Sequence, residues 1–365
     1  MELRRVVGSL LVVGLESTKL LPLERAWLRV IRPGGVILFR RNIEEAAQCR
    51  ALLDDATALC AEDAHRCVDL EGGAVDRLRN ALAPMPAPQL VAEVMRRTGK
   101  PQYAHRHGVL IGRAVRAFGF NTTLAPVLDL ALPCSAGVMG TRVAAEDAQG
   151  VTDYASEFLN GLSEQKVAGC GKHFPGLGGG LCDSHLETPA ILRTRRELER
   201  EDLAPYRALK KQLPMVMVNH AAYPKTASGE RPASVSRYWM TGVLRKQMQY
   251  RGIIFSDDLE MGGILQYAPM EEAVVEGFRA GIDLVEICHS PELILRAFEA
   301  LLHEGERSAS FRKLLVQRAA HVQRARRRLF AEGAGRPLTA RGLASLRTSV
   351  ERFAQELEAR KGSAA

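Results

Sequence analysis

The chain has 365 residues, of which 46% are hydrophobic and 25% charged, and this composition is that of a globular protein. No apolar run reaches the roughly 18 residues that a membrane-spanning helix needs. The apolar stretch near the N-terminus is interrupted by Gly8 and Gly14 and lacks a cleavage site, which argues against a signal peptide. The excess positive charge of the chain, formally +8, is concentrated in residues 307–328, which carry eight basic residues and no acidic one. Without interleaved aromatic residues, this segment indicates a solvated helix face rather than a nucleic-acid surface.

The seven cysteines are an odd number without a closely spaced pair. This usage is typical of reduced thiols in a cytoplasmic protein, and we expect that location. The sequence has no zinc-protease motif, no calcium-binding loop and no phosphate-binding loop ending in Gly-Lys-Ser/Thr. We therefore expect neither a metal nor another cofactor.

Short apolar runs of strand length alternate with longer stretches of helical periodicity along the chain. The expected strands are residues 10–14, 34–39, 65–70, 123–130, 167–174, 214–220, 252–258 and 283–288. The expected helices include residues 43–61, 91–118, 151–165, 236–250 and 270–280. This alternation predicts an α/β protein with a parallel sheet covered on both faces. The pattern alone leaves open whether the sheet is a closed barrel or a doubly wound open sheet.

Polar and ionisable residues at the ends of the strands favour the barrel. They are Asp69, Lys172, His173, Asn219, His220, Asp257, Asp258 and His289. In a barrel these ends converge on one mouth, where active sites form, whereas in an open sheet they would spread along a line. We therefore predict a single (β/α)8 barrel over residues 1–300. Residues 301–365 are expected to add helices and a polar tail that pack on it.

A glycine-rich segment, KHFPGLGGGLCDSHLETP, follows the fifth expected strand. In it, Asp183 could accept a hydrogen bond from the ring of His185, which would fix the tautomer of the histidine and raise its basicity. The glycines would let such a loop swing over a pocket. An isolated Asp-Ser-His is more often a surface turn with a capping aspartate.

The segment GIIFSDDLEM places two carboxylates at the end of the seventh strand. A carboxylate held there is rigid and partly desolvated, which suits a nucleophile or a stabiliser of a cationic transition state. Because neighbouring residues of a strand face opposite sides, we expect only one of Asp257 and Asp258 to point into the mouth. A helix N-cap is an equally good interpretation of these residues alone.

The segment VDLEGGAVDRL follows the third strand. Asp69 could accept hydrogen bonds from sugar hydroxyls and Arg77 could donate them, while Glu71 could do the same or brace the loop. The glycine pair 72–73 indicates a turn in either case. Arg142, taken by itself, is an ordinary solvated loop arginine.

Together these segments resemble glycoside hydrolase family 3 in order, from about residue 7 to residue 290. The likeness is carried by VDLEGGAVDRL, NTTLAPVLDLAL, KHFPGLGGGLCDSHLETP and FSDDLEM, and it is strongest to the cytoplasmic β-N-acetylglucosaminidases of that family. The resemblance implies a retaining exo-glycosidase that removes terminal N-acetylglucosamine from muropeptides in cell-wall recycling. It also implies a monomer that binds small glycans, with neither nucleic acid nor a membrane as partner.

The resemblance assigns roles to individual residues. Asp257 would be the nucleophile that forms a glycosyl-enzyme, and His185 the acid/base with Asp183 as its partner. The residues expected to hold the sugar are Asp69, Arg77, Arg142, Lys172 and His173. A neutral histidine does not repel an anionic nucleophile, and its ordinary pKa lies near neutrality.

The chain departs from the family pattern at several points. The second histidine of the loop is Leu177 here, the following Asp-Thr pair is Gly179-Gly180, and an arginine is replaced by Ala74. The segment after the substrate arginine also differs, at residues 143–147. These changes leave the rate, the loop motion and the aglycone preference open. A family 3 hydrolase of other β-glycosides, and a glycan-binding barrel without catalysis, are the alternatives.

Overall fold

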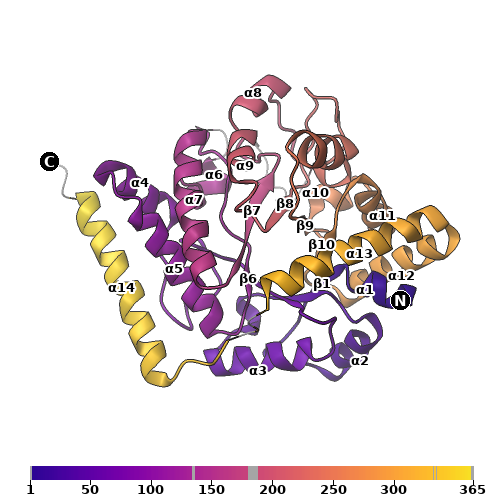
Figure 1. The fold of residues 1–365 in the computed structure, drawn as a ribbon, viewed down its shortest axis with the longest axis horizontal. Helices are drawn as coiled ribbons and strands as arrows, with labels where there is room; N and C mark the ends of the chain where they lie inside the picture. Colours follow the sequence, from indigo (N-terminus) through magenta and orange to yellow (C-terminus); the bar gives the residue numbers. More distant parts are fainter. Residues whose placement is uncertain (1, 134–135, 180–187, 332, 334, 363–365) are drawn as a thin grey trace.

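The structure, a computed structural model, describes residues 2–133, 136–179, 188–331, 333 and 335–362, and in them eight parallel strands close into a barrel (Figure 1). The barrel strands are β1 (Leu11–Gly14), β2 (Gly35–Leu38), β3 (His65–Val68), β6 (Thr122–Thr123), β7 (Ala168–Phe174), β8 (Met215–Val218), β9 (Ile253–Asp258) and β10 (Leu284–Ile287). Each pairs with its neighbour in this order, and β10 pairs with β1 to close the ring. The (β/α)8 barrel that the sequence predicts is confirmed.

Helices surround the barrel. They are α1 (Leu3–Gly8), α2 (Pro22–Ile31), α3 (Ala46–Thr57), α4 (Pro88–Thr98), α5 (Gln102–Ala117), α7 (Ala148–Glu164), α8 (Arg195–Arg200), α9 (Leu203–Leu209), a π-helix η5 (Tyr238–Gln247), α11 (Met270–Ala280) and α12 (Pro291–Arg307). Short helices in the connections are η1 (Arg40–Asn42), α6 (Ala136–Met139), η3 (Gly140–Arg142), η4 (Ala233–Val235) and α10 (Gly262–Leu265). The long helices bury one apolar face, as Leu110, Ile111 and Val115 of α5 show.

The expected single helix over residues 91–118 is wrong, because the structure has two helices there, α4 and α5. Gly99 ends α4 with a φ of 63°, a left-handed conformation that glycine adopts without a side-chain clash. Pro101 precedes α5 and restricts the residue before it to non-helical conformations.

The expected strand over residues 123–130 is also shorter than predicted, because β6 ends at Thr123. Pro126 has no N–H group to give to a ladder. The chain nevertheless continues beside β7, since Val127 bridges to Lys172 and the Leu128 N–H group donates to the Lys172 carbonyl at 2.6 Å. This path carries Asp129 alongside β7.

The turn predicted at residues 72–73 is confirmed as the corner of a hairpin between β4 (Leu70–Gly72) and β5 (Val75–Asp76). Gly72 has a φ of 96°, and a Cβ atom there would lie 2.1 Å from the Pro86 carbonyl oxygen, so only glycine fits. The two residues that flank the hairpin lie close together, because the Arg77 N–H group donates to the Asp69 carbonyl at 3.3 Å.

Two helices follow α12 in the C-terminal part, α13 (Ala309–Leu329) and α14 (Ala340–Gly362). α13 packs against α1 and α12, whereas α14 lies along α4 and α5 (Figure 1). The interpretation of the basic segment as a solvated face is wrong for Arg326, which is buried and donates to the Gly34 carbonyl at 2.8 Å. Arg318 likewise forms an ion pair with the buried Asp283 at 3.1 Å. The division of the chain at residue 300 stays a prediction.

Among the described helices, none combines the length and the apolar character needed to cross a membrane. The described cysteines are buried and unpaired: Cys49, Cys60, Cys67, Cys170 and Cys288.

Candidate active site

A buried network of opposite charges lies where β3 and β7 end. The Lys172 ammonium is 2.8 Å from Asp69 Oδ1 and 2.7 Å from Glu71 Oε1. The guanidinium of Arg142 holds both oxygens of Glu71, at 2.9 and 2.8 Å. Arg77 lies 3.5 Å from the other oxygen of Asp69. The structure thus brings together four of the predicted sugar-binding residues, and the interpretation of Arg142 as a solvated loop residue is wrong.

The network keeps its members charged at neutral pH. Burial would raise the pKa of Glu71, but the cations of Arg142 and Lys172 outweigh it and lower that pKa to about 2. Burial also opposes the ionisation of Asp69, whose pKa is nevertheless held below its usual range by Lys172 and Arg77. Burial would lower the pKa of Lys172, but the carboxylates of Asp69 and Glu71 raise it. Glu71 therefore holds the two cations of Lys172 and Arg142 in place.

His173 has a fixed tautomer. Its Nδ1 atom lies 2.7 Å from Asp129 Oδ2, and its Nε2 atom lies 3.4 Å from a guanidinium nitrogen of Arg142. Because a guanidinium can only donate, Nε2 is the acceptor and Nδ1 carries the proton. The carboxylate of Asp129 also accepts the backbone N–H groups of His173 at 3.1 Å and Leu177 at 2.6 Å. Asp129 was not singled out from the sequence, although an acid in the apolar run TLAPVLDL was the available signal.

The carboxyl pair at the end of β9 is half-buried, and Asp257 Oδ1 accepts the backbone N–H of Asp258 at 3.0 Å. Across the interface with β10, Glu286 pairs in register with Asp258. Burial, and then the negative charges of Asp258, Asp69 and Asp257, raise the pKa of Glu286 well above its usual value. Glu286 therefore lies near carboxylates from both sides of the barrel. An acid in the apolar run DLVEIC was the signal for it in the sequence.

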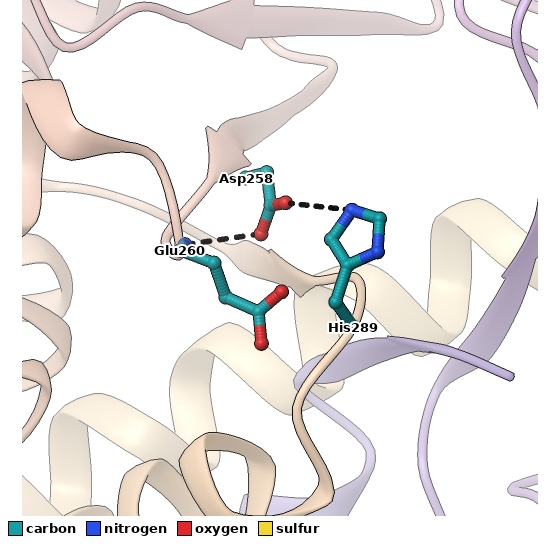
Figure 2. A group of neighbouring side chains, drawn as sticks. All are labelled: Asp258, Glu260 and His289. Atoms are coloured by element: carbon teal, nitrogen blue, oxygen red, sulfur yellow. Dashed lines mark hydrogen bonds and ion pairs between the residues drawn. The ribbon is translucent and has the colours of Figure 1, made fainter. Parts of the chain in front are cut away.

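Asp258, Glu260 and His289 carry side chains of the kinds that bind metal ions, and their candidate ligand atoms all lie within 4.8 Å of one another (Figure 2). His289 Nε2 is 3.8 Å from Asp258 Oδ2, and Asp258 Oδ1 accepts the Glu260 N–H at 3.1 Å. Arg41 lies 3.0 Å from His289 Nδ1 and can only donate, so the ring proton sits on Nε2. With that proton, Nε2 has no lone pair for a cation, and the geometry describes a His–Asp pair. Burial and the charge of Glu260 raise the pKa of Asp258 to about 7.

The side chains at the end of β8 brace its neighbours. Asn219 donates to the His173 carbonyl and to the Tyr223 hydroxyl, both at 2.9 Å. His220 Nε2 lies 3.0 Å from the Asp258 carbonyl, which can only accept. These contacts tie β7, β8 and β9 together directly below the mouth.

The predicted acid/base His185 and its partner Asp183 lie outside the described residues. On the entry side of that loop, Leu177 is buried at the end of β7. On the exit side, the Thr188 hydroxyl donates to the Gly263 carbonyl at 2.7 Å, in α10 directly after β9. The chain therefore leaves β7 and returns beside the end of β9.

An eight-stranded α/β barrel with carboxylates at the ends of β3 and β9, and basic side chains among them, has the groups that a protein of the glycoside hydrolase class uses. Residues 3–325 match the model of the glycosyl hydrolase family 3 N-terminal domain. The chain belongs to this family, and it is a glycoside hydrolase.

Individual relatives agree with this assignment. A β-hexosaminidase of Alkalilimnicola ehrlichii is 39% identical over 287 residues, which are 78% of this chain and 82% of the relative. A family 3 β-N-acetylglucosaminidase from Paenibacillus sp. superimposes with a TM-score of 0.87 at 29% identity, covering 97% of this chain and 68% of its own. NagZ of Neisseria gonorrhoeae in complex with N-trifluoroacetyl-D-glucosamine gives a TM-score of 0.76 at 28% identity, covering 94% and 98%.

Proposed function

We propose that the protein is a retaining exo-β-N-acetylglucosaminidase that removes terminal N-acetylglucosamine from muropeptides, as a cytoplasmic monomer in cell-wall recycling. The observation that carries the proposal is the charged network of Asp69, Lys172 and Arg142, which shares the barrel mouth with Asp257. The names of the relatives, β-hexosaminidase and β-N-acetylglucosaminidase, support the choice of sugar.

The network is suited to hold the hydroxyls of the non-reducing sugar. Asp69 keeps 13% of its side chain exposed and Arg142 keeps 17%, although both are paired. Their remaining donor and acceptor capacity can serve a ligand without unpairing a buried charge. Arg77 adds a half-buried guanidinium beside Asp69.

Asp257 is the proposed nucleophile. Its carboxylate attacks the anomeric carbon while the bond to the leaving oxygen breaks, and His185 gives that oxygen a proton. In the second half, His185 takes a proton from water, whose oxygen displaces Asp257 from the anomeric carbon. Asp183 orients His185 and stabilises its protonated form. Thr188 donates to the carbonyl of Gly263 in α10, the helix that follows the strand carrying Asp257, and this contact supports assigning the acid/base to the segment that ends at Thr188.

Three experiments test the function. A chromogenic β-N-acetylglucosaminide should turn over faster than the matching β-glucoside, and the reverse order would overturn the choice of sugar while leaving the mechanism standing. Asp257→Ala should abolish turnover of both. Incubation with a 2-fluoro substrate should add one glycosyl unit to the peptide that contains Asp257. A protein without this adduct, and without turnover, would be a glycan-binding barrel instead.

A further inference from the structure

A buried arginine lies at the end of the barrel opposite the mouth. Arg326, near the end of α13, is only 2% exposed, and its Nη1 atom donates to the Gly34 carbonyl at 2.8 Å. Gly34 directly precedes β2, so this contact is at the N-terminal end of the parallel strands, whereas Asp69 and Asp257 lie at their C-terminal ends. A Cβ atom at residue 34 would lie only 2.9 Å from the same Nη1 atom, so glycine leaves the space that the guanidinium occupies.

The charge of Arg326 is not balanced by the protein. Within the described part of the chain, no carboxylate oxygen lies within ion-pair distance of its guanidinium, and its Nε atom is buried without a hydrogen-bond partner. Burial lowers the pKa of Arg326 to about 10, although the negative charge of Asp63 opposes this shift. A desolvated cation is unfavourable unless an anion and hydrogen-bond acceptors surround it. Arg326 therefore lacks the counter-charge that a buried arginine usually has.

Arg326 forms part of the wall of a cavity of about 200 Å³. The wall also contains Arg5 of α1 and Arg32 at the end of α2, so three guanidinium groups from three separate parts of the chain border one space. Gln323, about one turn before Arg326 on α13, adds a neutral amide. A single water molecule needs only roughly 15 Å³ of such space. The cavity therefore has room for a small ligand as well as water.

The other two arginines of the wall are only weakly engaged by acids. The carboxylate that faces Arg5 is 4.0 Å away, and both side chains of this pair are largely exposed. Arg32 donates to a neutral group, the Cys60 carbonyl, at 3.4 Å. Among the described residues that border the cavity, Glu62 is the one acid, and it lies 3.8 Å from Arg327, outside the cavity. Three guanidiniums and one carboxylate thus leave an excess of two positive charges around the space.

We propose that this cavity is a binding site for a phosphate group, with the buried Arg326 at its base and the exposed Arg5 and Arg32 at its opening. A phosphate group carries a charge of about −1.5 to −2 at neutral pH, which matches the excess of two positive charges. Its oxygens can accept N–H groups from several guanidiniums at once, and each guanidinium presents paired donors to such an oxyanion. A carboxylate has one charge and two oxygens, and it would leave part of the excess unmatched. The site lies at the opposite end of the barrel from Asp257 and is independent of the proposed function.

Calorimetric titration of inorganic phosphate into the full chain, at constant ionic strength, tests the site. We expect saturable binding of one phosphate per chain to the wild type. Arg326→Met keeps an unbranched side chain without the charge, and it should abolish the binding. Arg32→Gln should weaken the binding about tenfold, the usual effect of losing one charge-assisted hydrogen bond. The control is Arg352→Gln, which removes an exposed charge from α14 and should leave the affinity unchanged.

A second ligand identifies the source of the phosphate group. Glycerol phosphate carries the same group on an organic alcohol, at a similar charge. If it binds more tightly than inorganic phosphate, the ligand of this site is a phosphorylated metabolite, and if it binds more weakly, the ligand is the free ion. In either case Arg326→Met should remove the binding of both compounds.

Because Arg326 also donates to Gly34, Arg326→Met can lose stability, and Arg32→Gln provides the second reading. Phosphate should raise the melting temperature of the wild type more than that of Arg32→Gln. The readout is this difference, since phosphate salts also stabilise proteins in general through their exclusion from the surface. An absence of saturable phosphate binding in the wild type would overturn the proposal. So would an affinity that neither Arg32→Gln nor Arg326→Met changes, because the phosphate would then bind elsewhere.

Discussion

Glu286 on β10 lies in register with Asp258 on β9, so two carboxyl groups occupy adjacent strands at the barrel mouth. Both have a raised pKa, mainly because they are buried. Glu286 accepts a hydrogen bond from the Cys288 thiol at 3.4 Å, and its second oxygen has no partner among the described residues. The carboxyl of Glu286 is thus a buried polar group with one oxygen that has no hydrogen-bond partner among the described residues.

Replacing Glu286 by leucine should stabilise the protein. The change removes a poorly partnered buried carboxyl and keeps a similar volume, so we expect a gain of about 1 kcal/mol at pH 8. Chemical unfolding of the wild type and Glu286→Leu measures this difference. Glu299→Leu, on the exposed side of α12, is the control and should change stability by less than about 0.5 kcal/mol. A loss of more than about 2 kcal/mol in Glu286→Leu would show that Glu286 is ionised and paired.

Asp258 should make the protein less stable as the pH rises. Its pKa is 3.8 in the reference state and about 7 in the folded protein. Between these values the unfolded chain has released the proton and the folded protein still holds it, so stability falls as the pH increases from about 4 to about 7. Asp258→Asn copies the protonated form. It should raise the melting temperature by several degrees at pH 8, by clearly less at pH 5, and hardly at all at pH values below the ordinary pKa of 3.8.

The matched control for this measurement is Asp153→Asn, because Asp153 is exposed on α7. Its effect on the melting temperature should be small and equal at both pH values. A stabilisation by Asp258→Asn that is the same at pH 5 and pH 8 would contradict a raised pKa for this carboxyl.

The barrel could be predicted because its signals are local. Each strand is a short apolar run, and the strand ends carry the polar residues that point to a common mouth. The break between α4 and α5, which the apolar pattern did not predict, also has a local cause, because Gly99 and Pro101 lie at that point of the chain. The apolar periodicity continues through both residues, and that continuity is why the pattern predicts a single helix.

The site was only partly predictable. Asp69 and Lys172 stand at strand ends, and their convergence follows from the barrel. The bidentate contact between Arg142 and Glu71 joins residues 71 positions apart, and no local pattern encodes such a pair. The same holds for Asp129 beneath His173. The roles of Asp257, Asp183 and His185 stay predictions.

Glu71→Gln should weaken both stability and substrate binding. The amide leaves the buried cations of Lys172 and Arg142 with one carboxylate fewer, at a cost of about 3 kcal/mol near neutral pH. The pKa of Glu71 is lowered to about 2 in the folded protein, so its contribution is present above its ordinary pKa of 4.5 and is lost as the pH falls toward 2. The gap in unfolding free energy between wild type and variant should therefore close on acidification. KM should rise more than kcat falls, because Arg142 loses its fixed position.

Asp129→Asn should disturb the tautomer of His173. The carboxylate accepts three N–H groups, from the ring and backbone of His173 and the backbone of Leu177. An asparagine has one acceptor oxygen, so its amide N–H₂ group must face at least one of these donors. The ring of His173 can relieve the conflict by moving its proton from Nδ1 to Nε2, where it would oppose the Arg142 guanidinium. We expect kcat/KM to fall at least tenfold, consistent with the loss of one buried hydrogen bond, and the ¹⁵N shifts of His173 to report the exchanged tautomer.

The control for Asp129→Asn is Asp147→Asn, at the exposed N-cap of α7, where the side chain accepts the Gly150 N–H at 2.9 Å. This change should cost about 1 kcal/mol of stability or less and leave kcat/KM within about twofold. An unaltered His173 tautomer together with an undiminished kcat/KM in Asp129→Asn would show that Asp129 only anchors Leu177 at the start of the loop. A drop in kcat/KM with the original tautomer would assign the effect to that anchor, because Leu177 leads into the segment that carries His185.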